Sequence, residues 1–177
     1  MNNYFELLKN ILVIPKDVYD TGNYKEWNKF EEELGIILPD DYKKFITTYG
    51  TGSINNFIWF LTPFSEDENI NYLKKMNIIL QSYNISKNNF PKDFVHNTYP
   101  KKNGLLPWGY TENGDEMFWK ISEKIDDWEI IVYESRSSNF YSYKMQLVEF
   151  IYKLITKKIV CNAFPSDFLQ DGAKYLL

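Results

Sequence analysis

The chain has 177 residues and a formal net charge of −4 at pH 7, and 44% of its residues are hydrophobic, which is enough for one domain with a sizeable core. Arg136 is the one arginine among 20 basic residues. Nucleic-acid-binding domains rely on arginine for phosphate and base contacts, so this composition argues against a nucleic-acid partner. The single cysteine, Cys161, excludes an internal disulfide and fits a reducing compartment.

The N-terminal segment does not have the pattern of a signal peptide. It lacks a basic leader, and Glu6 and Lys9 interrupt its apolar residues. No stretch of the chain approaches the ~20 apolar residues of a membrane span. We therefore expect a cytoplasmic protein with no membrane partner.

Helical spacing of apolar residues predicts three helices at the start of the chain. The first covers residues 4–13, the second has Trp27 on its apolar face and stops at Gly35, and the third covers residues 39–49. The apolar run 54–61 follows. Because this run is apolar on both faces, it predicts one strand in the centre of a sheet.

The second half of the chain predicts one long helix, a group of strands and a last helix. Ser65 and Glu68 have the spacing of a capping box, which predicts a helix from there to about Tyr83. Asn113-Gly114 lies between two aromatic runs and predicts a β-hairpin with a two-residue turn. The remaining expectations are a long loop over 84–103, strands over 128–135 and around 136–142, a helix over 143–157, and a tail that packs back on the domain.

Along the chain, the predicted helices come first, the strands follow, and one helix comes last. This order is typical of an α+β fold. We expect a single domain over 1–177, with a mainly antiparallel sheet flanked by helices. A sheet that also contains parallel strands is the alternative. Its core covers residues 25–157. An N-terminal helix over 1–15 and a C-terminal tail over 158–177 form extensions.

No combination of residues predicts a catalytic, cofactor or metal site. His96 is the one histidine, and a metal site needs three or four ligands. Cys161 has no neighbouring base and is expected to be a small buried residue. The chain contains no nucleophile elbow, phosphate-binding glycine loop or zinc-protease motif. We therefore expect a protein that is not an enzyme.

The acidic residues are the strongest candidates for binding a partner. The run Glu66, Asp67 and Glu68 has a structural reading as the first turn of a helix, where the dipole favours anions. Residues 105–135 contain eight acidic side chains and two lysines, a net charge of −6, so the negative charge of the chain is concentrated there. A two-residue turn would place Glu112 opposite Asp115, and like charges in that arrangement destabilise a hairpin.

A basic partner would explain these opposed acids. The alternatives are that both are solvated, or that Asp115 hydrogen-bonds the turn backbone, which is the role we favour for Asp115. Aromatic residues between the acids are expected mostly in the core, but one or two left exposed could anchor a protein partner. The candidate partner-binding residues are Trp108, Tyr110, Glu112, Asp115, Glu116, Asp126, Asp127, Glu66, Asp67 and Glu68.

Two blocks of sequence resemble the SUKH superfamily, which includes the yeast Smi/Knr cell-wall regulators and many bacterial toxin-immunity proteins. The first is a tryptophan helix followed by LPDDYKKFITTYGTG, and the second is LLPWGYTENGDEMFW. The resemblance extends over about residues 25–157. It implies an α+β fold, provides no catalytic residues, and for bacterial members implies binding of a cognate toxin domain, often a nuclease.

These observations together predict an immunity protein. It would bind the C-terminal domain of a cognate toxin, a basic nuclease, through an acidic surface, as a monomer or weak dimer that does not itself contact nucleic acid. One alternative is a regulatory scaffold or small-ligand-binding domain of the Smi/Knr type. A second alternative is a hydrolase that uses Glu112, Asp115 or Glu116 as acid and base.

Overall fold

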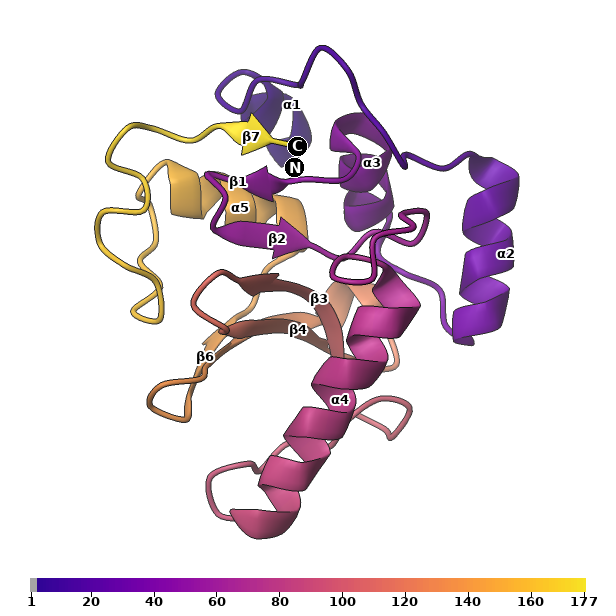
Figure 1. Ribbon diagram of the computed structural model, residues 1–177, viewed down its shortest axis with the longest axis vertical. Helices are drawn as coiled ribbons and strands as arrows, with labels where there is room; N and C mark the ends of the chain where they lie inside the picture. The colour runs from indigo at the N-terminus through magenta and orange to yellow at the C-terminus, as the bar shows by residue number, and fades with distance from the viewer. Residues whose placement is uncertain (1–2) are drawn as a thin grey trace.

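A computed structural model describes residues 3–177 as one sheet with helices on both faces (Figure 1). Met1 and Asn2, the start of the expected N-terminal helix, lie outside the described residues. The strands are β1 Ser53–Ile54, β2 Ile58–Phe60, β3 Leu105–Thr111, β4 Glu116–Lys120, β5 Glu129–Glu134, β6 Asn139–Tyr143 and β7 Tyr175–Leu176. The helices are α1 Tyr4–Lys9, α2 Tyr24–Leu34, α3 Asp40–Tyr49, α4 Tyr72–Asn89 and α5 Leu147–Ile155, with a short 3-10 helix, η1, at Ile125–Asp127.

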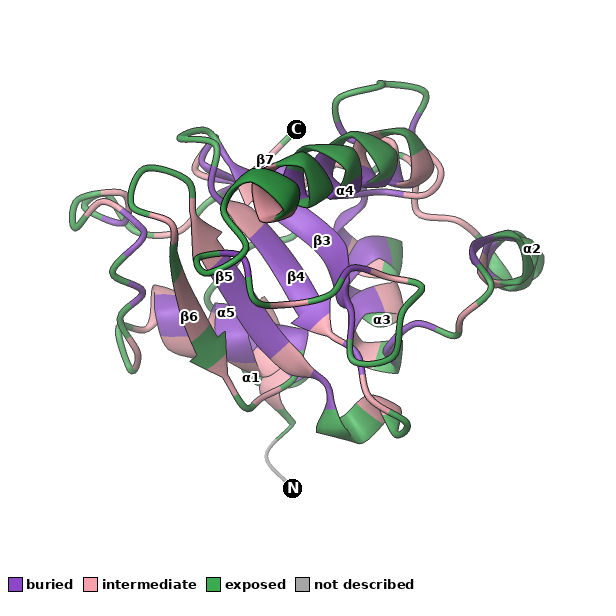
Figure 2. Ribbon diagram, turned by 90° about the horizontal axis from the view of Figure 1, so that it is seen from below, coloured by how far each residue is buried: buried purple, intermediate pink, exposed green. Residues whose placement is uncertain are grey.

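The seven strands are ordered β6-β5-β4-β3-β2-β1-β7, and every pair of named strands is antiparallel. The expected α+β architecture with an antiparallel sheet is therefore confirmed. Strands β3 to β5 are mostly buried, and β6 forms a more exposed edge (Figure 2).

Alternating residues of β4 show which helices cover each face of the sheet. Phe118 packs edge-on against Tyr83 of α4, and Trp119 packs edge-on against Tyr42 of α3. Because neighbouring residues of a strand point to opposite faces, α4 covers one face and α3 covers the other. Helix α5 lies on the α3 side, where Phe150 contacts Trp108 of β3. Both faces are thus packed, which explains why the central strands are apolar throughout.

The expected helices α2 and α3 are present and end as their sequences indicate. Gly35 follows α2 with a φ of 81°, a left-handed conformation that glycine adopts without steric cost. Asn23 begins α2 with a capping box, in which its side chain accepts from the Glu26 backbone and Glu26 accepts in return. Asp41 in the first turn of α3 accepts a hydrogen bond from the Val148 backbone at 2.8 Å, which ties α3 to the start of α5.

The prediction of one central strand over 54–61 is wrong, because this segment folds into a short hairpin of β1 and β2. Asn55 and Asn56 have φ values of 55° and 52°, and the Phe57 amide donates to the Ile54 carbonyl. Two consecutive residues with positive φ make the tight turn that matches the twist of paired strands, and asparagine tolerates that conformation.

The prediction of a helix start at Ser65 is also wrong. Helix α4 begins at Tyr72, where the Asn71 side chain accepts from the Lys74 backbone, and it continues to Asn89 rather than ending at Tyr83. The Ser65 hydroxyl instead accepts from the Asp67 amide within a turn. The two terminal helices, α1 and α5, are each shorter than predicted.

The C-terminal tail packs back on the domain, as expected, and the structure shows where. Strand β7 pairs with β1, and Phe164 and Phe168 contact Phe57. The side-chain amide of Asn55 donates to the Phe168 and Gly172 carbonyls at 2.8 and 2.7 Å, and its oxygen accepts from the Lys174 amide at 2.8 Å. One turn residue therefore holds three points of the tail.

This arrangement predicts that Asn55→Ala and Asn56→Ala differ although both sites have positive φ. Both variants incur left-handed strain, but only Asn55→Ala loses the three tail hydrogen bonds. We expect the free energy of unfolding to fall by about 3 kcal/mol for Asn55→Ala and by about 1 kcal/mol for Asn56→Ala. Urea denaturation measures this difference, and limited proteolysis should cleave the tail faster in Asn55→Ala alone. Equal losses would contradict the tail-anchoring role.

Candidate functional site

The turn between β3 and β4 has three residues, so the expected two-residue turn is wrong. The Thr111 amide donates to the Asp115 carbonyl at 2.9 Å, which leaves Glu112, Asn113 and Gly114 in the turn. Gly114 has a φ of 84°, the left-handed position that closes a three-residue hairpin loop. Glu112 therefore does not oppose Asp115. It is exposed at the tip of the hairpin.

Asp115 is fully buried and holds two turns together. Its side chain accepts from the Thr111 hydroxyl at 2.8 Å and from the Ser135 amide at 3.2 Å. Ser135 follows β5, so Asp115 links the end of that strand to the β3–β4 turn. We expected Asp115 to bond the backbone of its own turn, but its carboxylate instead accepts from the Thr111 hydroxyl and from the backbone after β5. Its burial removes Asp115 from the residues that a partner could contact.

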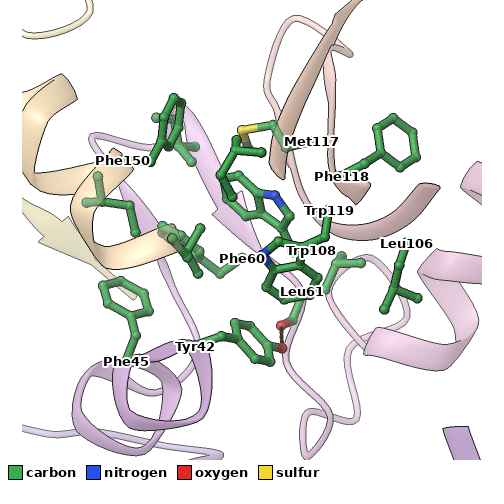
Figure 3. Close-up of a cluster of buried hydrophobic side chains, with 14 of the residues drawn as sticks. Tyr42, Phe45, Phe60, Leu61, Leu106, Trp108, Met117, Phe118, Trp119 and Phe150 are labelled. Carbon is green, nitrogen blue, oxygen red and sulfur yellow. Dashed lines mark hydrogen bonds between the residues drawn. The ribbon is translucent and has the colours of Figure 1, made fainter. Parts of the chain in front are cut away.

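Trp108 is also removed from the contact surface, because its side chain is fully buried (Figure 3). It stacks on Phe60 with ring centroids 5.9 Å apart and contacts Trp119 and Phe150. Its indole Nε1 has no hydrogen-bond partner among the described residues. The β3–β4 pairing has a register shift between Pro107 and Gly109, so Trp108 lies at this irregularity.

Glu116 is only partly accessible, because it points to the sheet face that α4 covers. It lies directly across from Tyr110 on β3 and Tyr133 on β5. Burial raises the pKa of its carboxyl to about 8, although nearby Lys75 of α4 acts in the opposite direction. Glu116 is therefore largely neutral at pH 7, and the structure corrects the expectation that it presents a charge to a partner.

Two of the expected acids come together across a hollow that we call the acidic hollow. Its volume is about 480 Å³, and its lining includes Trp59, Asp67, Ile70, Lys75, Tyr110 and Glu112. Asp67 belongs to the loop before α4, and Glu112 to the β3–β4 turn. Burial raises the pKa of the Tyr110 phenol, and the carboxylates of Asp67 and Glu112 raise it further. Both charges thus act on one tyrosine.

The floor of the acidic hollow combines aromatic rings with one cation. Trp59 of β2 is the direct cross-strand partner of Tyr110, so both side chains share one face of the sheet. The Trp59 indole Nε1 donates to the Glu112 carboxylate at 3.3 Å. The Lys75 ammonium lies 4.4 Å from the centre of the Tyr110 ring. Sequence reasoning missed Trp59, because the run that contains it was read as a central strand that is apolar on both faces. It missed Lys75 because the packing of α4 over Tyr110 has no signal in the local sequence.

The other expected acids are exposed but differ in position. Glu66 and Glu68 flank Asp67 in the loop before α4, and Glu68 forms an ion pair with Lys74 at 2.9 Å. Asp126 and Asp127 lie in η1 beside a different and larger hollow, of about 870 Å³. The Asp126 carboxylate accepts from the Gln146 side chain at 3.3 Å. The ten candidates therefore divide between two surfaces and the core.

The described residues contain little that suggests catalysis. In residues 3–177, no three or more His, Cys, Asp or Glu side chains are grouped to hold a metal ion. Cys161 is buried, and burial raises the pKa of its thiol. His96 is half-buried against Phe140, and burial lowers the pKa of its imidazole. No helix within this range is long and apolar enough to cross a membrane.

The family model described as SMI1-KNR4 cell-wall, of the SUKH group, matches residues 24–151. That range begins at α2 and ends within α5, so it includes β1 to β6, both sides of the acidic hollow and most of the core. The chain belongs to the SUKH superfamily. No curated protein and no solved structure matches it. The resemblance inferred from the two sequence blocks is thereby confirmed, and the tail that carries β7 lies outside the matched SUKH region.

The buried carboxyl of Glu116 predicts a pH-dependent stability. The unfolded pKa is 4.5 and the folded pKa is about 8, so the folded state binds more protons between these values. Stability should therefore be greatest below pH 4.5 as far as this group is concerned, fall as the pH rises, and level off above pH 8. We expect Glu116→Gln to remove this slope and to raise the free energy of unfolding at pH 8.5 by about 3 kcal/mol.

Urea denaturation of both proteins between pH 5 and 8.5 measures the effect. The matched control is Glu112→Gln, which makes the same chemical change at an exposed position four residues away. That variant should keep the slope of the unchanged protein. A Glu116→Gln variant with an unaltered slope would contradict the buried position of this carboxyl.

Proposed function

We propose that the chain is an immunity protein that binds and neutralises a bacterial toxin domain, a nuclease with a basic surface, by protein–protein contact. Membership of the SUKH superfamily supports the class of function. The observation that carries the contact is the convergence of Asp67 and Glu112 on one hollow from two separate elements. With Glu66 and Glu68 beside them, these carboxylates form the acidic surface of the proposal.

The electrostatics of this surface suit a nuclease. A nuclease has a basic cleft for its phosphate substrate, and exposed carboxylates can occupy such a cleft as phosphate mimics. Complementary charge also accelerates association, which matters for an inhibitor that must capture a lethal enzyme quickly. The carboxylates lie in a turn and a loop, so they project beyond the packed sheet.

The direct test is protection of cells. We expect the gene immediately upstream to encode a large toxin with a C-terminal nuclease-like domain. Expression of that domain alone should kill a bacterial host, and co-expression with this chain should restore growth. A purified one-to-one complex should form without loss of either protein. Continued killing in the presence of soluble, folded immunity protein would overturn the proposal.

Charge-reversal variants test whether the toxin domain contacts the acidic surface or another part of the molecule. We expect Glu66→Lys with Glu112→Lys to slow association with the toxin domain by about tenfold at low salt, because both positions are exposed, Glu112 lines the acidic hollow, and Glu66 directly precedes the lining residue Asp67. Asp126→Lys with Asp127→Lys is the matched control, since it changes the net charge equally on the other surface. Glu116 is avoided because its burial would confound folding with binding.

Surface plasmon resonance at two salt concentrations measures this difference. The difference in association rate constant between the two double variants should become smaller as the salt concentration rises, because salt screens exposed charges. A larger effect from the Asp126 and Asp127 variant would place the contact at the hollow beside η1 instead.

A regulatory role remains the second candidate, and the family description favours it through its reference to the cell wall. A scaffold or small-ligand-binding domain of this type would have several partners and no adjacent toxin gene. Affinity purification from the native host separates the two functions: one toxin as the dominant partner supports immunity, and several regulatory proteins support the scaffold.

A further inference from the structure

We propose that the acidic hollow is the binding site for one arginine side chain of the partner protein. The guanidinium of this arginine stacks on Trp59 between the carboxylates of Asp67 and Glu112. This inference rests on the proposed function for the identity of the partner. Lys75 is a cation of the chain itself and competes with the incoming guanidinium for the same hollow.

The two carboxylates are available to an external cation. Neither Asp67 nor Glu112 forms an ion pair with a lysine or arginine in residues 3–177, whereas nearby Glu68 is paired with Lys74. The Asp67 side chain accepts from the Asn69 amide at 2.8 Å, and Glu112 accepts from Trp59. These bonds orient the two carboxylates while leaving acceptor capacity on both.

The aromatic floor makes the hollow more than an acidic cluster. Trp59 is half-buried, whereas the other four tryptophans of the chain are buried. A large aromatic ring that stays accessible beside a hollow is typical of a residue that anchors a protein contact. The Lys75 ammonium already lies over the neighbouring Tyr110 ring, which demonstrates that a cation is accommodated on this floor.

Arginine fits this geometry better than lysine. Its guanidinium is planar, so it stacks on an indole while its edge donates to carboxylates on either side. A lysine ammonium is a compact charge without a planar face, so it cannot combine flat stacking on an indole with the fixed fork of donors that arginine presents to carboxylates. Lys75 does not fill this role, because it lies over Tyr110 and forms no ion pair with Asp67 or Glu112 within the described residues.

The accessible position of Trp59 provides a selective readout. Acrylamide quenches exposed tryptophans far more than buried ones, so quenching of the full chain reports on Trp59, and Trp59→Phe identifies its share of the signal. The probe is Nα-acetyl-arginine amide at low salt. The controls are the matching lysine amide and the citrulline amide, which is uncharged but has nearly the same shape as arginine.

We expect saturable protection of Trp59 by the arginine amide, weaker protection by the lysine amide and none by the citrulline amide. Glu112→Gln or Asp67→Asn should weaken arginine binding by about threefold, which lies within the range for one exposed charge pair. Asp126→Asn should have no effect. Lys75→Gln should tighten binding by a similar factor, because it removes the competing cation.

Three results would overturn the inference: equal protection by arginine and citrulline, stronger protection by lysine, or weaker binding in Lys75→Gln. Quenching of the complex with the toxin domain then separates the two proposals. If the toxin domain binds and acrylamide still quenches Trp59, the proposed arginine-binding site is wrong and the immunity function stands. If the arginine amide protects Trp59 but the toxin domain does not bind, the proposed immunity function is wrong and the arginine-binding site stands.

Discussion

The buried hydrogen bond from Tyr42 to the Leu61 carbonyl, at 2.6 Å, is the contact on which the remaining arrangement depends. Tyr42 is fully buried in α3, and Leu61 is the residue at which the chain leaves β2 (Figure 3). A backbone carbonyl in this position would be costly without a donor. The same tyrosine ring packs on Trp119 and Trp27, so it joins the sheet, α2 and α3 at one point. The path of the chain after β2, and hence the loop with Asp67, follows from this anchor.

Two carboxylates four residues apart in the β3–β4 hairpin illustrate how position decides chemistry. Glu112 is exposed in the turn and bonded to an indole, whereas Glu116 points under α4 and loses most of its hydration. Burial of an acid without a partner favours its neutral form, so the same residue type acts as a charge in one place and as a polar spacer in the other. The negative charge of the sequence therefore overstates the charge that this hairpin presents.

The sequence predicted the framework well where its signals are local and repeated. The apolar faces of α2 and α3 and the glycine after each lie where their chemistry requires, and a hairpin is present at Asn113-Gly114 although its turn has three residues instead of two. It failed where two local readings compete. The run 54–61 is apolar enough for one strand, but the pair Asn55-Asn56 prefers a turn, and pairing with the distant β7 decides in favour of the hairpin.

The acidic hollow was only half predictable for a related reason. Asp67 and Glu112 were recognised as candidate contacts, but nothing in the order of the chain places a loop at residue 67 beside a turn at residue 112. The antiparallel pairing of β2 with β3 sets Trp59 beside Tyr110 and brings Glu112 next to the start of β2. The loop that carries Asp67 is closed separately, by backbone hydrogen bonds that join Thr62 to Ile70 and Tyr72. Ser65 and Glu68 matched a capping box in spacing alone, and Asn71 made the stronger cap six residues later.

The surface that would meet a partner is separated from the interactions that hold the fold. Asp115 stabilises the hairpin from inside, and the turn residue Glu112 contributes no backbone hydrogen bond through its carboxylate. Glu66 likewise projects from a loop whose turn is held by Ser65 and Asp67. Changes at the exposed acids therefore alter charge and shape at little cost in stability. A fold built in this way can keep its core while its exposed acids are replaced, so the contact surface and the framework can change independently.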